Sequence, residues 1–405
     1  MNQGHNVFLT GEGGVGKSFL TQQFVKGQWL KGNKVQKLGS TGIAATNIGG
    51  RTIHSFFRFG LWQDLPDDYF SKLENNRKYT KQIRMAKTIL IDEISMTPSN
   101  IIVNIDKVLR YFKDSDKPFG GTQMIFVGDL SQLKPISRLK KPFMFQNDAW
   151  KQGNFKSCYL TKNHRQTGDS KLLTLLNNMR SNKLTEEDID LLNSRITLDP
   201  PKDITRLYTH NIDVDGLNSQ RLLEIDKPLQ TFNFISRGDV HTVNTIFKNS
   251  LIEQKLELKE GALVMFIKNN VDKGYVNGTT GTVINFTGGI PVVKTKDGKV
   301  VYVERETWTQ ENEGGVVVAS ITQIPLKLGF ATTVHKSQGL TLDSAVIDLS
   351  RSFTEALGYV ALSRVKTLEG IHLLGYNDTA LEMDPFILTV DPIIRKKSKE
   401  EEELL

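Results

Sequence analysis

One glycine-rich segment of the sequence has the composition of a phosphate-binding loop. Residues 11–18 read GEGGVGKS, which fits the pattern G-x-x-x-x-G-K-S. Glycines let backbone N–H groups surround phosphate oxygens, and a helix that begins at the end of the loop adds a favourable dipole. Lys17 is expected to reach the β- and γ-phosphates, and Ser18 to ligate Mg²⁺. The other predicted nucleotide contacts come from the loop itself, at Gly11, Gly13, Gly14, Val15 and Gly16.

Two acidic residues follow another apolar segment further along the chain. Asp92 and Glu93 end the segment KTILIDE (87–93). A carboxylate at the end of a buried strand beside a phosphate loop holds the magnesium shell, which is the role predicted for Asp92. Glu93 is then the candidate general base that polarises the attacking water. Acidic pairs after apolar segments are common, so this prediction depends on the phosphate loop.

A third apolar segment carries two more polar candidates. Asp129 ends TQMIFVGD (122–129), and Gln132 follows shortly after. A glutamine at this edge of a sheet can orient water and detect the γ-phosphate, as glutamines do in other NTPases. A structural loop cap is the simpler interpretation of Asp129, and it applies less well to Gln132.

These segments predict an α/β fold. Apolar runs at 6–11, 87–93 and 122–129 are typical of buried parallel strands, which carry functional residues at their carboxyl ends. The segment 18–30 is expected to be a helix with apolar positions at Phe19, Leu20, Phe24 and Trp29. Strands that alternate with helices favour a doubly wound parallel sheet.

Composition limits the class of protein. The chain has 405 residues, 38% hydrophobic and 24% charged, which favours a globular protein of two or three domains. A single cysteine, Cys158, excludes an internal disulfide and a multi-cysteine zinc site. No apolar run approaches the roughly 20 residues that cross a bilayer, and no cleavable leader is evident, so a soluble intracellular protein is expected. The net charge of +7 favours a polyanionic partner, but only weakly.

Changes in character along the chain predict its domains. The polar segment near 60–81 is interpreted as a small insertion in a first lobe, 1–165. Residues 255–322 are β-rich, with a KDGK hairpin turn, and predict a small β-barrel inserted in a second lobe. That lobe comprises 166–254 and 323–385, and the charge run in 386–405 is interpreted as a solvated tail.

Seven segments, in this order, resemble the motifs of superfamily 1 helicases. They are GEGGVGKS (11–18), TGIAATNIGGRTIHSFF (41–57), DEISM (92–96), GDLSQLKPI (128–136), HRQTGDSKLLTLLNNMR (164–180), VHKSQGLTLD (334–343) and YVALSRVKTLEGIHLL (359–374). The sequence is most similar to the PIF helicase family, allied to RecD, in the 5′-to-3′ branch. The match runs from about Asn6 to Tyr376. It implies two RecA-like lobes that hold Mg-ATP between them, with an SH3-like barrel at 255–322 and a wedge near 60–81.

The resemblance also assigns roles to individual residues. It implies that Arg165 and Arg364 reach ATP from the second lobe and stabilise the transition state, and that Gln338 is the glutamine of the nucleotide-linked KSQG motif. It implies single-stranded DNA and duplex junctions as partners of a monomer. The implied strand contacts are Thr41, Asn47, His54 and Ser55 in the first lobe and Thr332, His335, Lys336 and Ser337 in the second.

Some positions depart from the family pattern or fit a simpler role. Only ten residues precede Gly11, and Gln3 is too close to match the family's nucleotide-selecting glutamine. Leu130 and Ser131 replace the usual aromatic pair after GD. Aromatic residues near the second motif are more often core than strand contacts, so at most one of four is expected to stack on a base: Phe56, Phe57, Phe59 and Trp62.

Two other classes of function compete with a helicase. A P-loop kinase or GTPase would share the phosphate loop, but the sequence has no NKxD motif, and neither class explains a second α/β lobe. An ATP-gated translocase or clamp that never separates duplexes needs the same hydrolytic residues, so it stays open. DNA rather than RNA, and the direction of movement, follow from the resemblance alone.

Overall fold

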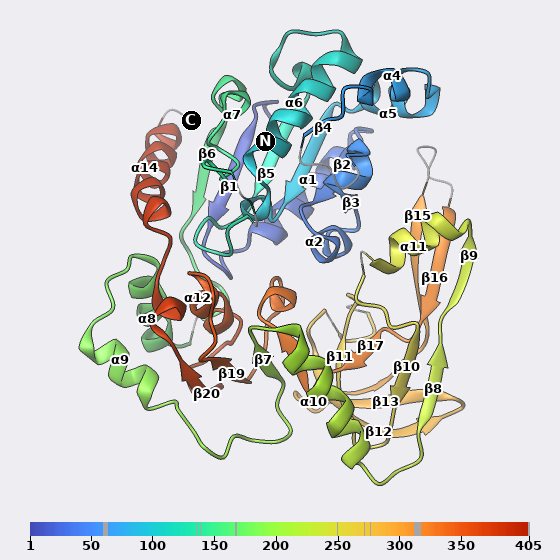
Figure 1. Ribbon diagram of the computed structural model, residues 1–405, viewed down its shortest axis with the longest axis vertical. Helices are drawn as coiled ribbons and strands as arrows, with labels where there is room; N and C mark the ends of the chain where they lie inside the picture. The colour runs from blue at the N-terminus through green and yellow to red at the C-terminus, as the bar shows by residue number, and fades with distance from the viewer. Residues whose placement is uncertain are drawn as a thin grey trace. The chain divides into compact units, whose positions relative to one another are not determined.

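The computed structural model describes residues 1–59, 64–135, 137, 139–166, 168–248, 250–270, 272–275, 277–311 and 317–403 (Figure 1). The chain divides into two compact units. The first comprises Met1–Arg165 and Asp384–Leu405, and the second Gln166–Met383. Within the described ranges, no helix combines the length and apolar character needed to cross a membrane.

The first unit has a parallel sheet with the strand order β3-β2-β4-β5-β1-β6. Its strands are β1 (Val7–Gly11), β2 (Val35–Gly39), β3 (Arg51–Thr52), β4 (Thr88–Asp92), β5 (Gln123–Val127) and β6 (Lys156–Leu160). The three apolar segments predicted as strands are β1, β4 and β5. They are neighbours in the sheet, so their carboxyl ends lie side by side.

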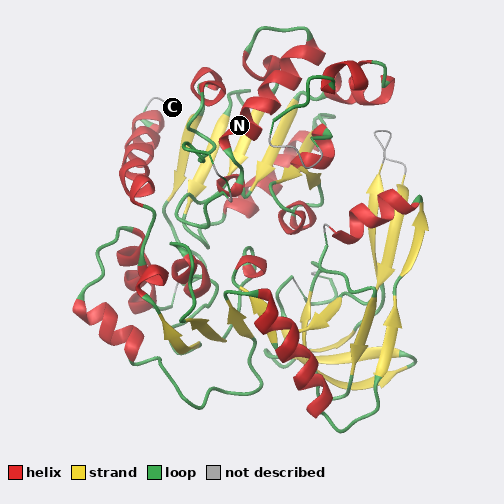
Figure 2. Ribbon diagram, viewed as in Figure 1, coloured by secondary structure: helices red, strands yellow, loops and turns green. Residues whose placement is uncertain are grey.

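Helices cover both faces of this sheet (Figure 2). They are α1 (Lys17–Leu30), α2 (Gly42–Asn47), α3 (Ile53–Phe57), α4 (Tyr69–Glu74), α5 (Arg77–Met85), α6 (Ser99–Lys113), α7 (Asp148–Gly153) and α14 (Pro385–Glu402). Phe8 and Ile91 belong to the core that α6 covers, whereas their neighbours Leu9 and Leu90 pack with Phe24 of α1. This alternation follows from the two-residue period of a strand. The predicted α/β fold is confirmed.

The helix after the phosphate loop buries fewer apolar residues than its sequence suggests. Phe24 is buried, but Phe19 and Trp29 are 67% and 74% exposed. The helix predicted over 18–30 is confirmed as α1, but of its four apolar positions Leu20 is also exposed, so only Phe24 is buried. Phe19 and Trp29 lie five residues before and after Phe24, a spacing that places them on other faces of the helix.

The polar segment near 60–81 contributes to the core of the first unit from Tyr69 onward. Helices α4 and α5 bury Tyr69, Tyr79 and Ile83. Both tyrosine hydroxyls donate to the backbone carbonyl of Phe57, and Tyr79 does so at 3.1 Å. The helical part of this segment thus belongs to the core, since two aromatic residues anchor it, and not to an element outside the core as the sequence suggested; its role as an inserted wedge stays a prediction.

The charged C-terminal segment is a helix and not a solvated tail. Helix α14 belongs to the first unit and packs along β6. Ile387 is buried in the core of that unit, and Val390 and Ile394 pack against the same core. The apolar residues that make this packing precede the charge run. The run RKKSKEEEE by itself gives no sign of a packed helix.

The α/β part of the second unit has a parallel sheet with the order β18-β7-β19-β20. Its strands are β7 (Arg206–Tyr208), β18 (Ala331–Thr333), β19 (Ala345–Leu349) and β20 (Ile371–Tyr376). Its helices are α8 (Ser170–Arg180), α9 (Glu186–Asn193), α10 (Asn211–Glu224), α12 (Leu357–Leu362) and α13 (Asp378–Leu381).

The β-rich part of the second unit begins earlier than 255. One antiparallel sheet has the order β14-β13-β12-β11-β17, and two further groups are β15-β16-β9 and β10-β8. The strands are β8 (Gln230–Asn233), β9 (Ile235–Gly238), β10 (Lys255–Leu258), β11 (Leu263–Phe266), β12 (Thr280–Thr287), β13 (Ile290–Thr295), β14 (Val300–Tyr302), β15 (Glu306–Glu311), β16 (Val317–Gln323) and β17 (Leu326–Leu328). Helix α11 (Val240–Lys248) lies between β9 and β10 in sequence. Strands β8 and β9 are short and mostly polar, so the sequence does not predict them as strands. The SH3-like character of this region stays a prediction.

Candidate functional site

The phosphate loop lies between β1 and α1, the setting that its sequence predicts. Lys17 Nζ donates to the backbone carbonyl oxygens of Gly11 and Glu12 at 2.7 and 2.8 Å. Gly16 caps the N-terminus of α1 with φ 89°, and Ser18 is exposed in the first turn. Backbone N–H groups at such a helix start form an anion site, because they have no partner within the helix.

The segment after β6 is hydrogen-bonded to the phosphate loop. Asn163 Nδ2 donates to the carbonyl of Gly13 at 3.1 Å, and the backbone N–H of His164 donates to the carbonyl of Gly14 at 2.9 Å. Gly14 has φ +90°, and a Cβ there would lie 2.6 Å from Cβ of Arg165. Glycine is required at this position by both its backbone conformation and its close neighbour.

Arg165 therefore belongs to the nucleotide side of the first unit. Its backbone N–H donates to Asn163 Oδ1 at 2.9 Å, directly beside the phosphate loop. The expectation that Arg165 comes from the second lobe is wrong. The physical reason is that β6 is the neighbour of β1, so the chain that leaves β6 passes the loop that leaves β1.

The two acidic residues lie where β4 ends. Asp92 is the last residue of the strand, and its Oδ1 accepts from the backbone N–H of Glu93 at 2.9 Å. Burial, and then the neighbouring Glu93 carboxylate, raise the pKa of Asp92 to about 7, while Lys17 acts in the opposite direction. Glu93 has φ 51°, a left-handed backbone that is unfavourable for a residue with a side chain and that recurs at functional sites.

Asp129 and Gln132 form a connected pair after β5. Asp129 is fully buried, and its carboxylate accepts from the backbone N–H of Ser131 at 3.1 Å and from Gln132 Nε2 at 3.3 Å. Asp129 thus acts as the loop cap that the sequence suggested. It also holds Gln132, which is itself buried, in a defined orientation.

The second unit holds the other two residues assigned to the nucleotide. Arg364 is 2% exposed, and its guanidinium donates from Nε to the carbonyl of Val360 at 3.0 Å and from Nη2 to Ser363 Oγ at 2.9 Å. Gln338 is also buried and directly follows the 3₁₀ turn His335–Ser337. Both side chains are therefore fixed by packing in this structure.

The strand-contact candidates of the first unit lie on α2 and α3. Thr41 caps α2, where its hydroxyl accepts from the backbone N–H of Ala44 at 3.2 Å, and Asn47 ends that helix. His54 and Ser55 are half-buried in α3. Burial lowers the pKa of His54, so its imidazole is neutral at pH 7.

The aromatic residues next to these candidates belong to the core. Phe56, Phe57 and Phe59 are at most 1% exposed. Trp62 lies outside the described residues. This agrees with the expectation that most of the four aromatic residues pack in the core.

The counterparts in the second unit divide into two pairs. Thr332 and Ser337 are fully buried; Thr332 Oγ1 accepts from Lys327 Nζ at 3.2 Å, and Ser337 Oγ donates to the carbonyl of Val334 at 2.7 Å. These two hydroxyls are inaccessible in this structure. His335 and Lys336 are half-buried and keep exposed surface. The motif therefore supplies two accessible strand candidates and two structural ones.

Comparisons with known proteins identify the family of this chain. A profile of the PIF1-like helicase family matches residues 1–188, and one of the DNA helicase Pif1 2B domain matches residues 242–286. A protein named ATP-dependent DNA helicase Pif1, from Psychrobacter sp., is 35% identical over 99% of this chain and 70% of its own length. The chain belongs to the Pif1 helicase family. The resemblance drawn from the motifs is confirmed.

Solved structures of Pif1 proteins have the same fold. Bacteroides sp. Pif1 in complex with ADP-AlF4 is similar with a TM-score of 0.85 and 30% identity, covering 98% of this chain and 94% of that one. Bacteroides Pif1 bound to ssDNA is similar with a TM-score of 0.68 and 30% identity, covering 99% and 95%.

The structure adds one feature that the motifs of this Pif1-family chain did not reveal. Phe353 is 57% exposed in the loop after β19. Its ring stacks on His335 at 5.9 Å with an interplanar angle of 7°, and its centroid lies 5.2 Å from that of His210. The sequence analysis missed Phe353, and the one signal that could have found it is a single aromatic residue in a polar loop after an apolar strand. The three rings form an aromatic group suited to stacking with a base.

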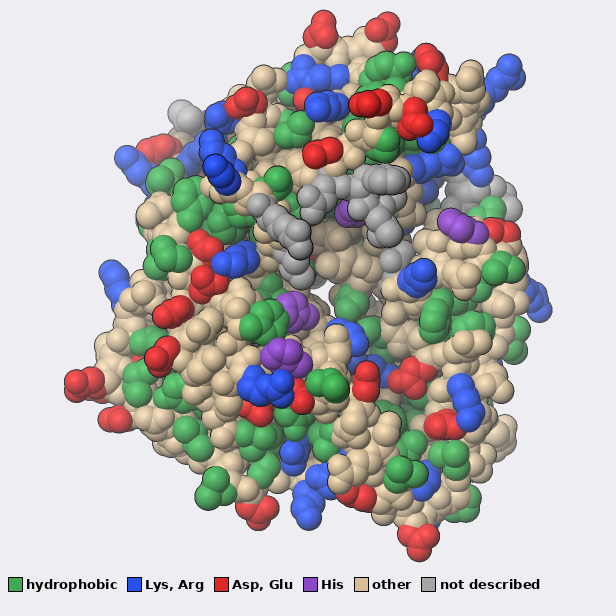
Figure 3. All heavy atoms as spheres, viewed as in Figure 1, with side chains coloured by type: hydrophobic (Ala, Val, Ile, Leu, Met, Phe, Trp, Pro, Cys, Tyr) green, Lys and Arg blue, Asp and Glu red, His purple; other side chains and the backbone are tan. Residues whose placement is uncertain are grey.

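Surface charge contributes little to the assignment of this Pif1-family site. On the face that Figure 3 shows, Lys and Arg side chains are interspersed with Asp and Glu. On this face the basic side chains are not separated from the acidic ones, so the net charge of +7 does not by itself indicate where a polyanion would bind.

Proposed function

We propose that this chain is an ATP-dependent DNA helicase that moves 5′-to-3′ along single-stranded DNA and separates the duplex ahead of it. The observation that supports this most directly is the grouping of Lys17, Asp92 and Gln132 at neighbouring strand ends in a member of the Pif1 family. A phosphate loop with a complete set of hydrolytic side chains fits an active ATPase better than a passive nucleotide site.

We propose Asp92 and Ser18 as the residues that hold Mg²⁺ together with the phosphates of ATP. Magnesium in NTPases is bound by one or two protein oxygens and by the phosphates, so no larger acidic cluster is required. The half-buried carboxyl of Asp92, with its raised pKa, fits a cation, because a nearby positive charge favours the ionised form. When bound, the ion neutralises charge on the phosphates.

Each remaining residue of the nucleotide site then has a proposed task. Lys17 stabilises the β- and γ-phosphates, with the loop backbone at Gly11, Gly13, Gly14, Val15 and Gly16 surrounding them. Glu93 accepts a proton from the attacking water, and Gln132 orients that water. Arg165, beside Gly14, and Arg364 supply positive charge where negative charge develops, and Gln338 couples the nucleotide to the strand motif.

Strand binding is proposed for the accessible residues of the two motifs. In the first unit these are Thr41, Asn47, His54 and Ser55, whose polar groups suit phosphate and sugar contacts. In the second unit His335 and Lys336 take this role, and Phe353 adds stacking with a base. Thr332 and Ser337 support the motif from within, because their hydroxyls are bonded inside the unit.

The first test is ATP hydrolysis with and without single-stranded DNA and RNA at two salt concentrations, followed by strand displacement on a substrate with a 5′ tail. Strong stimulation by DNA, weaker at high salt, and displacement of the duplex are expected. Stimulation without displacement would favour a translocase or clamp instead. Hydrolysis that neither nucleic acid changes would contradict the proposal.

A further inference from the structure

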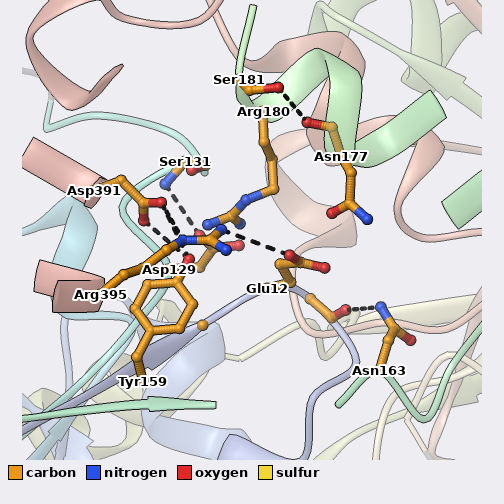
Figure 4. A network of polar contacts seen from close by, with 12 residues as sticks. Glu12, Asp129, Ser131, Tyr159, Asn163, Asn177, Arg180, Ser181, Asp391 and Arg395 are labelled. Atoms are coloured by element: carbon orange, nitrogen blue, oxygen red, sulfur yellow. Dashed lines mark hydrogen bonds and ion pairs between the residues drawn. The ribbon is translucent and has the colours of Figure 1, made fainter. Parts of the chain in front are cut away.

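A residue of the C-terminal helix contacts the phosphate loop. Nη2 of Arg395, in α14, lies 3.8 Å from Oε1 of Glu12, the second residue of the loop. Its Nε donates to Asp391 at 2.8 Å, and its guanidinium carbon lies 4.4 Å from the centre of the Tyr159 ring (Figure 4). Tyr159 Oη in turn donates to Asp391 at 3.0 Å. Arg395 is therefore held in place by an acidic residue and an aromatic ring while it faces Glu12.

Helix α14 also completes the edge of the parallel sheet. Strand β6 is the last strand beside β1, so one side of its backbone has no neighbouring strand in that sheet order. The N–H of Ser157 donates to Glu401 at 2.5 Å, and the N–H of Tyr159 donates to Ser398 Oγ at 2.8 Å. Lys397 Nζ donates to the carbonyl of Phe155 at 3.0 Å. Side chains of the helix thus take the place of a further strand and fix α14 relative to β1 and its loop.

Glu12 occupies an unfavourable position for an acidic residue. Its side chain is 11% exposed, within a loop whose composition suits phosphate oxygens, and a carboxylate there repels an anionic ligand. Its own backbone carbonyl accepts from Lys17 Nζ at 2.8 Å. The Arg395 guanidinium offsets the charge of Glu12 and restrains the residue that orients Lys17.

We propose that Arg395 is a positioning residue for the nucleotide site, and that helix α14 is a functional part of that site. This rests on the proposed function, because it assigns ATP to the loop. Arg395 acts through Glu12 and not on the reacting atoms. Its loss should weaken ATP binding, because the charge of Glu12 is then no longer compensated, and should leave kcat nearly unchanged.

The test compares Arg395→Ala with wild type in ATP affinity, KM for ATP, kcat and thermal unfolding, using the full chain. A partly exposed ion pair contributes modestly, so the KM and the dissociation constant for ATP should rise about two- to fivefold, with kcat preserved. Lys396→Ala is the matched control, since Lys396 is 80% exposed on the same helix and pairs with Glu400. It should bind ATP like wild type.

The variant Glu12→Gln distinguishes a charge effect from a loss of structure. In the double variant Glu12→Gln with Arg395→Ala, ATP affinity should return to within twofold of Glu12→Gln alone, because the repelling charge is gone. Unchanged affinity in Arg395→Ala would overturn the inference. The inference would also be overturned if Arg395→Ala bound ATP more weakly, unfolded at a lower temperature and did not regain affinity when Glu12→Gln was added. If wild type itself binds no ATP, the proposed function fails instead.

Discussion

In the first unit, strand β1 continues through a glycine-rich loop into α1, whereas in the second unit strand β7 continues through Thr209 and His210 into α10. Both strands belong to parallel sheets, and both lead directly into a helix. Only the first connection allows backbone N–H groups to surround a phosphate, because glycines permit φ near +90° at Gly14 and Gly16. The same architecture therefore carries different chemistry.

The other strand ends extend this comparison. In the first unit, β4 ends at the acidic Asp92, and β5 is followed by the amide of Gln132. In the second unit, β18 and β19 are followed by basic and aromatic groups, at Lys336 and Phe353. Parallel sheets place functional residues at their carboxyl ends, and the loop sequence decides which ligand they suit. The proposed function therefore assigns ATP hydrolysis to side chains of the first unit and strand contacts to side chains of both units.

The largest expected effect separates hydrolysis from binding in the first unit. Glu93→Gln should lower kcat for ATP by about 10²–10⁴-fold, the usual contribution of a general base. ATP and single-stranded DNA should still bind, since the amide has nearly the same shape as the carboxylate. Turnover and binding are measured on the same preparation. A Glu93→Gln variant that unwinds duplex DNA at the wild-type rate would exclude Glu93 as the base.

The next effect tests the phosphate loop itself. Lys17→Ala should lower ATP turnover by about 10²–10³-fold, because a preorganised positive charge at the phosphates is lost. Affinity for single-stranded DNA without nucleotide should stay within about twofold of wild type. Lys26→Ala, an exposed lysine of the same helix α1, serves as the control and should hydrolyse ATP normally. Equal losses in both variants would point to the helix and not to the loop.

A smaller effect is expected from the aromatic group of the second unit. Phe353→Ala should weaken single-stranded DNA binding by about 1–3 kcal/mol, the range for loss of one stacked base. Basal ATP hydrolysis without DNA should be unchanged. Leu198→Ala is a suitable control, since Leu198 is 99% exposed in the same unit. Fluorescence anisotropy with a labelled oligonucleotide measures both, and equal affinity of Phe353→Ala and wild type would remove Phe353 from the strand site.

The smallest effect is a pH dependence of strand binding. Burial, and then the nearby His210, lower the pKa of His335 below its ordinary value of 6.5, so His335 is neutral at pH 7. When the His335 imidazole takes up a proton, it gains a positive charge that attracts the phosphates of the bound DNA strand. DNA affinity should therefore rise as pH falls below 6.5, by about two- to fivefold for one partly exposed charge. Titrating anisotropy between pH 5.5 and 7.5 tests this, and His335→Gln should show a smaller increase.

Much of the nucleotide site could be predicted because it is contiguous in sequence. Residues 11–18 contain the turn, the charge and the helix start together, so the pattern alone indicates phosphate chemistry. Asp92 and Gln132 were predicted because apolar runs before them indicated buried parallel strands. The strand motifs were less informative. Thr332 and Ser337 have the same residue types as accessible contacts but are buried, and burial depends on packing that a motif does not contain.

The sequence by itself determined the α/β fold, the phosphate loop, the acidic residues at the strand ends and the family, since each of these depends on short segments with a fixed local pattern. Only the tertiary structure showed that the charged C-terminal segment is a helix at the edge of β6, that Arg395 faces Glu12, and that Phe353 stacks on His335. These contacts join residues far apart in the chain. Their formation depends on the packing of whole elements, which local propensity and charge do not specify.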